Sequence, residues 1–215
     1  MNKLIVFDLD GTLIDSVPDI KDCINDMLKK FGHKERQLSE IKQMIGHGAR
    51  NLVKNAIGED LTKDQLQARL DYYNDIYTNS GSPKTKLFDG IANVLNEFKA
   101  RGFLLAVLTN KPQETTDDVY NTYLSEFGFD CVIGQRPEFK IKPDPDALLY
   151  LLEKLNVKKE NAFFVGDGET DVQVGINAGV KSVAVLWGYR TKNQLESAGA
   201  TIFANEPKDL LNLIF

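Results

Sequence analysis

The sequence predicts an α/β protein with a doubly wound sheet and a lobe of helices inserted after the first strand. Short apolar runs recur along the chain, and segments with helical periodicity separate them. One long stretch near the N-terminus carries helical patterns without a strand signal. Runs that do not alternate with polar residues are typical of strands buried on both faces of a parallel sheet.

The apolar runs have the length of strands and are rich in Val, Ile, Leu and Phe. They lie at residues 4–7, 103–108, 162–165, 182–187 and, more weakly, 201–204. Helices are predicted between them where apolar residues recur at helical spacing, as in 91–98, 147–155 and 173–178. Gly102 predicts the end of the first of these helices.

The stretch from about 17 to 80 contains apolar residues at helical spacing only. Its three groups are Ile20, Ile24, Met27 and Leu28; Leu52, Val53, Ala56 and Ile57; and Leu66, Leu70, Tyr73, Ile76 and Tyr77. Residues 79–83, Asn-Ser-Gly-Ser-Pro, indicate a linker. We therefore expect a core made of residues 1–14 and 84–215, and a helical lobe of residues 15–83.

Composition excludes several classes of protein. The chain has 215 residues, of which 42% are hydrophobic and 27% charged, as in ordinary globular domains. A net charge of −5 argues against a nucleic-acid binder. The apolar runs are too short for a membrane span or a signal peptide, so a cytoplasmic location is expected. Cys23 and Cys131 lack the spacing of metal ligands and are expected to be buried thiols.

The first polar motif, Asp8-Leu9-Asp10-Gly11-Thr12, directly follows the run 4–7. Side chains two apart on an extended segment point the same way, so Asp8 and Asp10 can face one crevice beyond the strand end. A carboxylate such as Asp8 can attack phosphorus, while a second one protonates the leaving oxygen and then deprotonates water. Gly11 permits close approach of the backbone to a ligand. The alternative is a polar turn that closes a strand.

Two further motifs supply groups that could hold a phosphate. Thr109 and Asn110 follow the run 103–108, where a hydroxyl and backbone N–H groups could bind phosphate oxygens, although Thr-Asn is also common in turns. Lys142 lies beside prolines that restrict its direction, and it could neutralise a transferring phosphoryl group. A solvent-exposed loop lysine is the alternative, and Lys140 is a nearby competitor.

The fourth motif, Gly-Asp-Gly-Glu-Thr-Asp at residues 166–171, follows the run 162–165. Carboxylates at a strand end suit Mg²⁺, although Asp167 or Thr170 could simply cap the next helix. A cluster of Asp8, Asp10 and Asp167 would repel itself without a cation. A carboxylate nucleophile is also repelled by a phosphate monoester unless a divalent cation and a lysine neutralise the charge. The sequence therefore predicts a Mg²⁺ cofactor.

In their order and approximate spacing, the four motifs resemble those of the haloacid dehalogenase superfamily over nearly the whole chain. The resemblance implies a Rossmann-like core of parallel strands, an inserted α-helical cap and phosphatase activity. It implies that Asp8 is the nucleophile and Asp10 the acid and base. Mg²⁺ would be held by Asp8, the backbone carbonyl of Asp10, and Asp167.

The resemblance also implies supporting residues. Thr109 and Lys142 would orient and neutralise the phosphoryl group, and Asp171 would support Lys142 or a metal-bound water. Further candidate substrate contacts are Gly11, Thr12 and Asn110. The expected partner is a small phosphorylated metabolite, and both a monomer and a homodimer are compatible with the sequence.

Within the superfamily, the chain is most similar to phosphoglycolate phosphatases. The similar segments are Leu-Ile-Asp-Ser at 13–16, Thr-Asn-Lys-Pro at 109–112, Lys-Pro-Asp-Pro at 142–145 and Ile-Gly-His-Gly-Ala-Arg at 45–50. In such enzymes a glycine-rich cap loop helps to select the substrate, so His47 and Arg50 are candidate substrate contacts. An ordinary surface turn is the alternative. Gly168 stands where many relatives have Ser or Thr, so this chain lacks one hydroxyl that could contact the substrate.

Other activities are compatible with the same motifs. A pyrophosphatase or a phosphosugar mutase would share them. A haloacid dehalogenase is disfavoured because that group lacks the second aspartate, which is Asp10 here. A non-catalytic phospho-acceptor like a receiver domain also combines Asp, Thr and Lys, but its acceptor follows a later strand and it has no helical lobe after the first.

Overall fold

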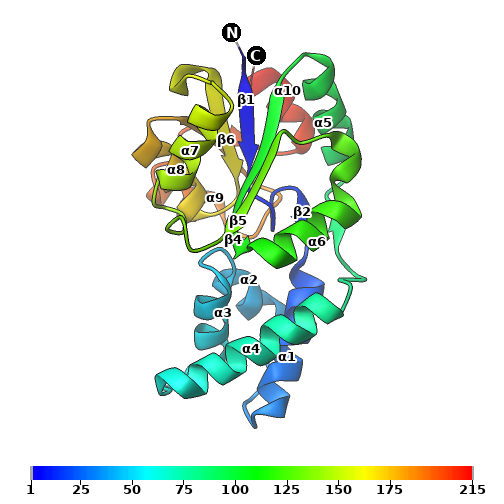
Figure 1. The fold of residues 1–215 in the computed structure, drawn as a ribbon, viewed down its shortest axis with the longest axis vertical. Coiled ribbons are helices and arrows are strands. Elements are labelled where there is room, and N and C mark those ends of the chain that lie inside the picture. The colour runs from blue at the N-terminus through cyan, green and yellow to red at the C-terminus, as the bar shows by residue number, and fades with distance from the viewer. Residues whose placement is uncertain (1, 215) are drawn as a thin grey trace.

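A parallel sheet of six strands forms the centre of the molecule (Figure 1), in a computed structural model that describes residues 2–214. The strand order is β5-β4-β1-β6-β7-β8, and all neighbours pair in parallel. The strands are β1 (Leu4–Phe7), β4 (Leu104–Pro112), β5 (Cys131–Gln135), β6 (Ala162–Gly166), β7 (Lys181–Val185) and β8 (Phe203–Ala204). Because all six run in one direction, their carboxyl ends share one edge of the sheet.

Helices cover both faces of this sheet, as the sequence predicts. Alternate side chains of β1 enter two different hydrophobic clusters, Ile5 and Phe7 on one face and Leu4 and Val6 on the other. The first face is covered by α5 (Ile91–Ala100), α6 (Gln113–Tyr123) and α10 (Leu210–Leu213), and the second by α7 (Asp146–Lys154) and α8 (Glu169–Ala178). The remaining short helices are α9 (Lys192–Ser197), η1 (Ser125–Phe127), η2 (Lys159–Asn161) and η3 (Pro207–Asp209).

All five predicted strands are present, but β5 was not predicted. Its apolar run is only Cys-Val-Ile before Gly134, which is shorter than the other runs. The bare Cα of Gly134 is needed for packing, because a Cβ there would come within 2.7 Å of the Thr116 hydroxyl on α6. Pairing with β4 thus creates this edge strand more than local sequence does.

Four helices follow the first strand and form a separate lobe, which lies beyond the carboxyl edge of the sheet (Figure 1). They are α1 (Val17–Lys30), α2 (Leu38–Met44), α3 (Ala49–Ile57) and α4 (Lys63–Asn79). Their apolar faces bury one another in a cluster that includes Ile24, Val53 and Tyr73. Thr62 starts α4 with a capping box, since its hydroxyl accepts from the Gln65 N–H at 3.2 Å. We call residues 17–79 the helical lobe.

A short antiparallel pair marks the two points where the chain crosses between sheet and lobe. β2 (Ile14–Asp15) pairs with β3 (Lys86–Leu87). Asp19 ties the return of the chain to the start of α1, because its carboxylate accepts from the Lys84 N–H at 3.0 Å and the Thr85 hydroxyl at 2.7 Å. The division into residues 1–14 with 84–215 and residues 15–83 stays a prediction.

Candidate active site

The polar motifs meet in a pocket between the carboxyl edge of the sheet and the helical lobe. Asp8 directly follows β1, Thr109 lies in the last part of β4, and Asp167 directly follows β6. All three line the pocket, together with Lys142 from the loop before α7. Strands that are adjacent in space but distant in sequence therefore bring these groups together, as the shared strand edge predicts.

Lys142 connects two of the carboxylates. Its ammonium nitrogen lies 2.7 Å from Asp8 Oδ1 and 2.6 Å from Asp171 Oδ1, and it donates to the Leu108 carbonyl at 3.0 Å. The lysine is buried, with 4% exposure. Contacts this short are typical of charge-assisted hydrogen bonds. The competitor Lys140 is exposed and reaches Asp144 at 3.4 Å, so the structure places Lys142 alone of these two in the pocket.

Three buried carboxylates form a compact acidic cluster. Atoms of Asp8, Asp167 and Asp171 lie within 4.8 Å of one another. Glycines make room for them, since a Cβ on Gly11 or Gly166 would collide with the carboxylates of Asp167 and Asp171 respectively. This close approach is what Gly11 contributes, and its φ of +92° is one that glycine adopts readily.

The electrostatics of the cluster favour an additional cation. Burial raises the pKa of Asp8 to about 7, although Lys142 opposes the rise. Burial also raises the pKa of Asp167 well above its usual value, and the charges of Asp171 and Asp8 add to the effect. Lys142 forms ion pairs with two of the three buried carboxylates, so the cluster carries a negative balance whenever all three are ionised. Oxygen donors in this arrangement fit a hard divalent cation such as Mg²⁺.

Asn110 and Thr12 position the charged residues. The Asn110 side chain accepts from the Lys142 N–H at 2.8 Å and donates to the Lys142 carbonyl at 3.0 Å, which holds the lysine loop against β4. It also donates to the Gly46 carbonyl of the lobe at 2.9 Å. The Thr12 hydroxyl donates to Asp167 Oδ1 at 3.2 Å. Asn110 lines the pocket, whereas Thr12 is fully buried and is not among the lining residues.

Asp171 has two partners at the start of α8. Besides the contact with Lys142, its other carboxylate oxygen accepts from the Gly168 N–H at 2.9 Å. It thus satisfies a backbone donor at the helix terminus and also holds the lysine. The sequence is compatible with a helix cap at Asp167 or Thr170, but Asp171 provides this contact.

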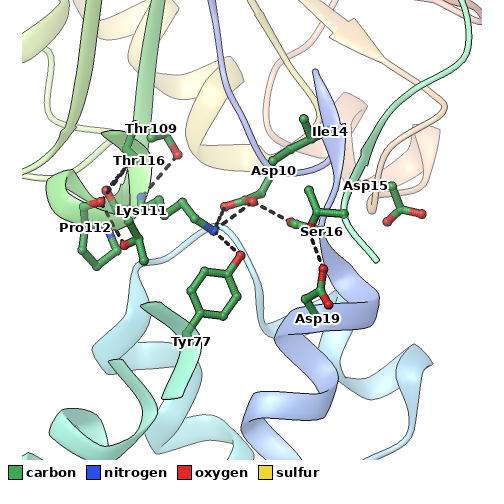
Figure 2. A network of polar contacts seen from close by, with 12 residues as sticks. Asp10, Ile14, Asp15, Ser16, Asp19, Tyr77, Thr109, Lys111, Pro112 and Thr116 are labelled. Carbon is green, nitrogen blue, oxygen red and sulfur yellow. Dashed lines mark hydrogen bonds and ion pairs between the residues drawn. The ribbon is translucent and has the colours of Figure 1, made fainter. Parts of the chain in front are cut away.

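Asp10 lines the same pocket but is not part of the acidic cluster, and its carboxylate takes part in a second polar network (Figure 2). Both of its carboxylate oxygens lie 3.2 Å from Lys111 Nζ, and one also accepts from the Ser16 hydroxyl. Lys111 Nζ further donates to the Tyr77 hydroxyl of α4 at 2.8 Å. Burial alone would lower the pKa of Lys111, but Asp10 and Tyr77 raise it above its usual value. Lys111 is therefore a buried cation in the pocket.

Sequence reasoning missed Lys111, Tyr77 and Arg190 as pocket residues. Lys111 stands next to Asn110, so the motif itself could have indicated it. Arg190 carried no local signal: it donates to Glu169 at 2.8 Å and to the carbonyls of Lys42 and Ile45 in the lobe at 2.8 and 2.7 Å. These bonds connect the lobe to the core and depend on tertiary packing.

The lobe loop that precedes α3 reaches the pocket. Ile45, Gly46 and Gly48 of this loop line the pocket, and so does Ala49 at the start of α3. His47 and Arg50 are exposed and are not among the lining residues, and the Arg50 side chain donates to Gln67 on α4. The structure therefore does not bring these two side chains together with Asp8.

Comparison with known proteins assigns the class. A model of the haloacid dehalogenase-like hydrolase family matches residues 5–185, so the chain belongs to this family. The expected superfamily resemblance is confirmed, and the chain is an enzyme, a phosphatase of this family.

Individual relatives support the same assignment. Phosphoglycolate phosphatase 1 of Pseudomonas aeruginosa is 32% identical over 97% of this chain and 78% of the relative. Phosphoglycolate phosphatase of Vibrio cholerae is 31% identical over 99% of this chain and 96% of the relative. The crystal structure of a predicted phosphoglycolate phosphatase from Haemophilus somnus 129PT has a TM-score of 0.90 at 27% identity, and covers 100% of this chain and 98% of that one.

The burial of both thiols agrees with expectation. Cys23 and Cys131 are both free and buried. Among residues 2–214, no helix combines the length and the apolar character that crossing a membrane requires.

Proposed function

We propose that this phosphatase hydrolyses a small phosphate monoester in two steps, with Mg²⁺ and an aspartyl-phosphate on Asp8. The observation that carries the proposal is the contact of Asp8 with Lys142 inside the cluster of Asp8, Asp167 and Asp171. Such a site holds a carboxylate nucleophile and a fixed cation where a phosphate can reach both.

In the first step, an Asp8 oxygen attacks phosphorus, and the bond between phosphorus and the ester oxygen breaks. Asp10 donates a proton to the departing oxygen, which leaves as an alcohol. In the second step, Asp10 takes a proton from water, and the resulting hydroxide attacks phosphorus and releases Asp8 and inorganic phosphate. Thr109 and Lys142 hold the phosphoryl oxygens during both steps.

Mg²⁺ would be held by the carboxylates of Asp8 and Asp167 and by the backbone carbonyl of Asp10, and it would supply positive charge next to the phosphoryl oxygens. Asp171 then keeps Lys142 in place through its 2.6 Å contact. Gly11 allows the backbone after β1 to pass close to Asp167.

We further propose that residues 15–83, which contain the helical lobe, act as a cap over the pocket. Pocket residues from both sides support this, as do the bonds from Arg190 to carbonyls of the lobe. A contact of His47 or Arg50 with substrate would require movement of the loop 45–50. The cytoplasmic location stays a prediction.

The substrate class follows from the relatives, several of which are named phosphoglycolate phosphatases. We propose 2-phosphoglycolate as the favoured substrate. The first test is a steady-state screen with Mg²⁺ against 2-phosphoglycolate, hexose phosphates, nucleotides and pyrophosphate. The highest kcat/KM for 2-phosphoglycolate supports the proposal. A higher value for pyrophosphate, or isomerisation of a hexose phosphate, would replace it with one of the other activities.

The covalent intermediate has its own test. Acid quenching during turnover, followed by intact-mass measurement, should show a population heavier by one phosphoryl group, and peptide analysis should locate it on Asp8. A label on another residue would contradict the assignment. A phosphorylated protein that never turns over would instead indicate a phospho-acceptor.

A further inference from the structure

The pocket holds a buried cation that the proposed reaction does not use. Among the described residues, three cationic side chains line it, namely Lys111, Lys142 and Arg190. Lys142 is engaged by Asp8 and Asp171 at 2.7 and 2.6 Å. The Arg190 guanidinium donates hydrogen bonds to Glu169 and to carbonyls of the lobe. Lys111 is the remaining cation in the pocket that could bind a negatively charged group of the substrate.

The contacts of Lys111 differ from those of Lys142. Both oxygens of Asp10 lie 3.2 Å from Lys111 Nζ, longer than the roughly 2.7–2.9 Å of a strong charge-assisted bond. The other partner, the Tyr77 hydroxyl, is neutral. Lys111 is nevertheless buried, with 8% exposure. The three donors of the Lys111 ammonium are shared between one carboxylate and one neutral hydroxyl, so an incoming anion would take a donor from the 3.2 Å contacts with Asp10.

The position of Lys111 defines where that anion must be. In the proposed mechanism, Asp10 contacts the ester oxygen of the leaving group. A group that lies 3.2 Å from the Asp10 carboxylate is therefore beside the first atoms of the leaving alcohol. Figure 2 shows Lys111 Nζ between Asp10 and Tyr77, at the boundary of sheet edge and helical lobe. The leaving group thus meets positive charge close to its ester oxygen.

We infer that Lys111, assisted by the Tyr77 hydroxyl of the lobe, forms a subsite for a carboxylate attached to the carbon that bears the ester oxygen. This inference rests on the proposed function, and it supplies the physical reason for selecting a short carboxylated phosphate such as 2-phosphoglycolate. Because Lys111 comes from the core and Tyr77 from α4, the carboxylate would contact both sides of the pocket.

Binding of inert ligands tests the subsite without turnover. The pair is 3-phosphonopropionate, which carries the carboxylate, and propylphosphonate, which has a methyl group in its place, each titrated calorimetrically with Mg²⁺. Wild type should bind the carboxylated ligand roughly 10- to 100-fold more tightly. Lys111→Met should reduce this ratio to about 3 or less, and Lys111→Arg should retain part of it. A wild-type ratio near one, or a ratio unchanged in Lys111→Met, overturns the inference.

Two further variants keep the test specific. Lys140→Met removes the same charge from an exposed side chain of a neighbouring loop and should leave the ratio unchanged. An equal loss in Lys140→Met would mean that general electrostatic attraction, rather than a subsite, selects the ligand. If Lys111→Met does not fold, Tyr77→Phe replaces it and should lower the affinity ratio of the two ligands a few-fold. An unchanged ratio in Tyr77→Phe would overturn the assistance by Tyr77.

Kinetics separate failure of the subsite from failure of the proposed function. For wild type, kcat/KM is compared between 2-phosphoglycolate and ethyl phosphate, which has a methyl group in place of the carboxylate. Turnover of both esters with the same ratio in wild type and Lys111→Met overturns the subsite and leaves the phosphatase mechanism intact. A Lys111-dependent preference in binding, with no turnover of either ester, supports the subsite and overturns the proposed reaction.

Discussion

The two sides of the pocket are built from different chemistry. On the sheet side, Asp8 and Asp167 at strand ends and Lys142 from the loop before α7 are buried ionisable groups in polar contact with their neighbours. On the lobe side, the lining residues are mostly apolar or aromatic. They include Ile20, Ile45, Leu52, Tyr73 and Tyr77. The lobe adds hydrogen-bonding groups mainly through the backbone, as at Gly46.

Because the two sides differ in this way, the sheet side can carry out the reaction while the lobe side selects the substrate. Phosphoryl transfer requires charges fixed in position, and strand ends in a packed sheet fix them well. Shape and a few polar groups on the lobe can decide which leaving group fits without altering those charges. The two sides should therefore respond differently to substitution, and the following experiments test that expectation.

The largest effect is expected for Asp8→Asn. An amide cannot serve as the nucleophile, so kcat/KM for p-nitrophenyl phosphate should fall by at least about 10⁴-fold. Circular dichroism should be unchanged, because the substitution keeps the size of the side chain. Asp89→Asn is the matched control at an exposed position and should keep full activity. Asp8→Asn activity within tenfold of wild type would remove Asp8 as nucleophile.

Asp167→Asn should greatly weaken the response to Mg²⁺ and stabilise the metal-free protein. The folded-state pKa of Asp167 is raised, so its contribution to stability is present below its unfolded pKa and is lost as pH rises through the folded value. At pH 8 without metal, the Asn variant should melt roughly 2–4 °C higher for each ~1 kcal/mol of relieved repulsion.

Mg²⁺ provides the second half of that experiment. In wild type at pH 8, Mg²⁺ at 100 times its Kd should stabilise the fold by about 2.7 kcal/mol. The Asn variant should gain much less. Equal Mg²⁺ stabilisation of both proteins would exclude Asp167 as a ligand, and a lower melting temperature in the variant would contradict the charge argument.

Arg190→Met tests the connection between the two sides. The substitution leaves the carbonyls of Lys42 and Ile45 without their buried donor. Backbone amides in 42–48 should exchange hydrogen roughly tenfold faster, and kcat/KM should fall about tenfold because the lobe is less well positioned. Arg101→Met, which removes an exposed arginine paired with Glu97, should change neither quantity. Unchanged exchange in Arg190→Met would show that other contacts hold the loop.

The smallest effect is expected for Arg50→Ala. Arg50 is exposed and bonded to Gln67, so KM for 2-phosphoglycolate should change less than about twofold. The measurement compares KM for 2-phosphoglycolate and p-nitrophenyl phosphate. A selective rise for 2-phosphoglycolate would mean that the loop 45–50 moves and brings Arg50 to the substrate during turnover.

The polar residues at the carboxyl edge of the sheet could be predicted because the sequence patterns that mark them are local. Each motif directly follows an apolar run, and parallel strands place their ends at one edge whatever their order in the sheet. The runs at 4–7 and 162–165 therefore indicated where Asp8 and Asp167 would meet. The edge strand β5 was harder to predict from the sequence, because three apolar residues and a glycine become a strand only through pairing with β4.

By itself, the sequence determined the α/β class, the helical segment after the first strand and the acidic residues at the strand ends, since periodicity and motif order are properties of the chain alone. The tertiary structure decided which lysines face the pocket, that Arg190 connects core and lobe, and that His47 and Arg50 lie outside the pocket. These depend on long side chains from distant segments, whose directions are set by packing and burial rather than by neighbouring residues.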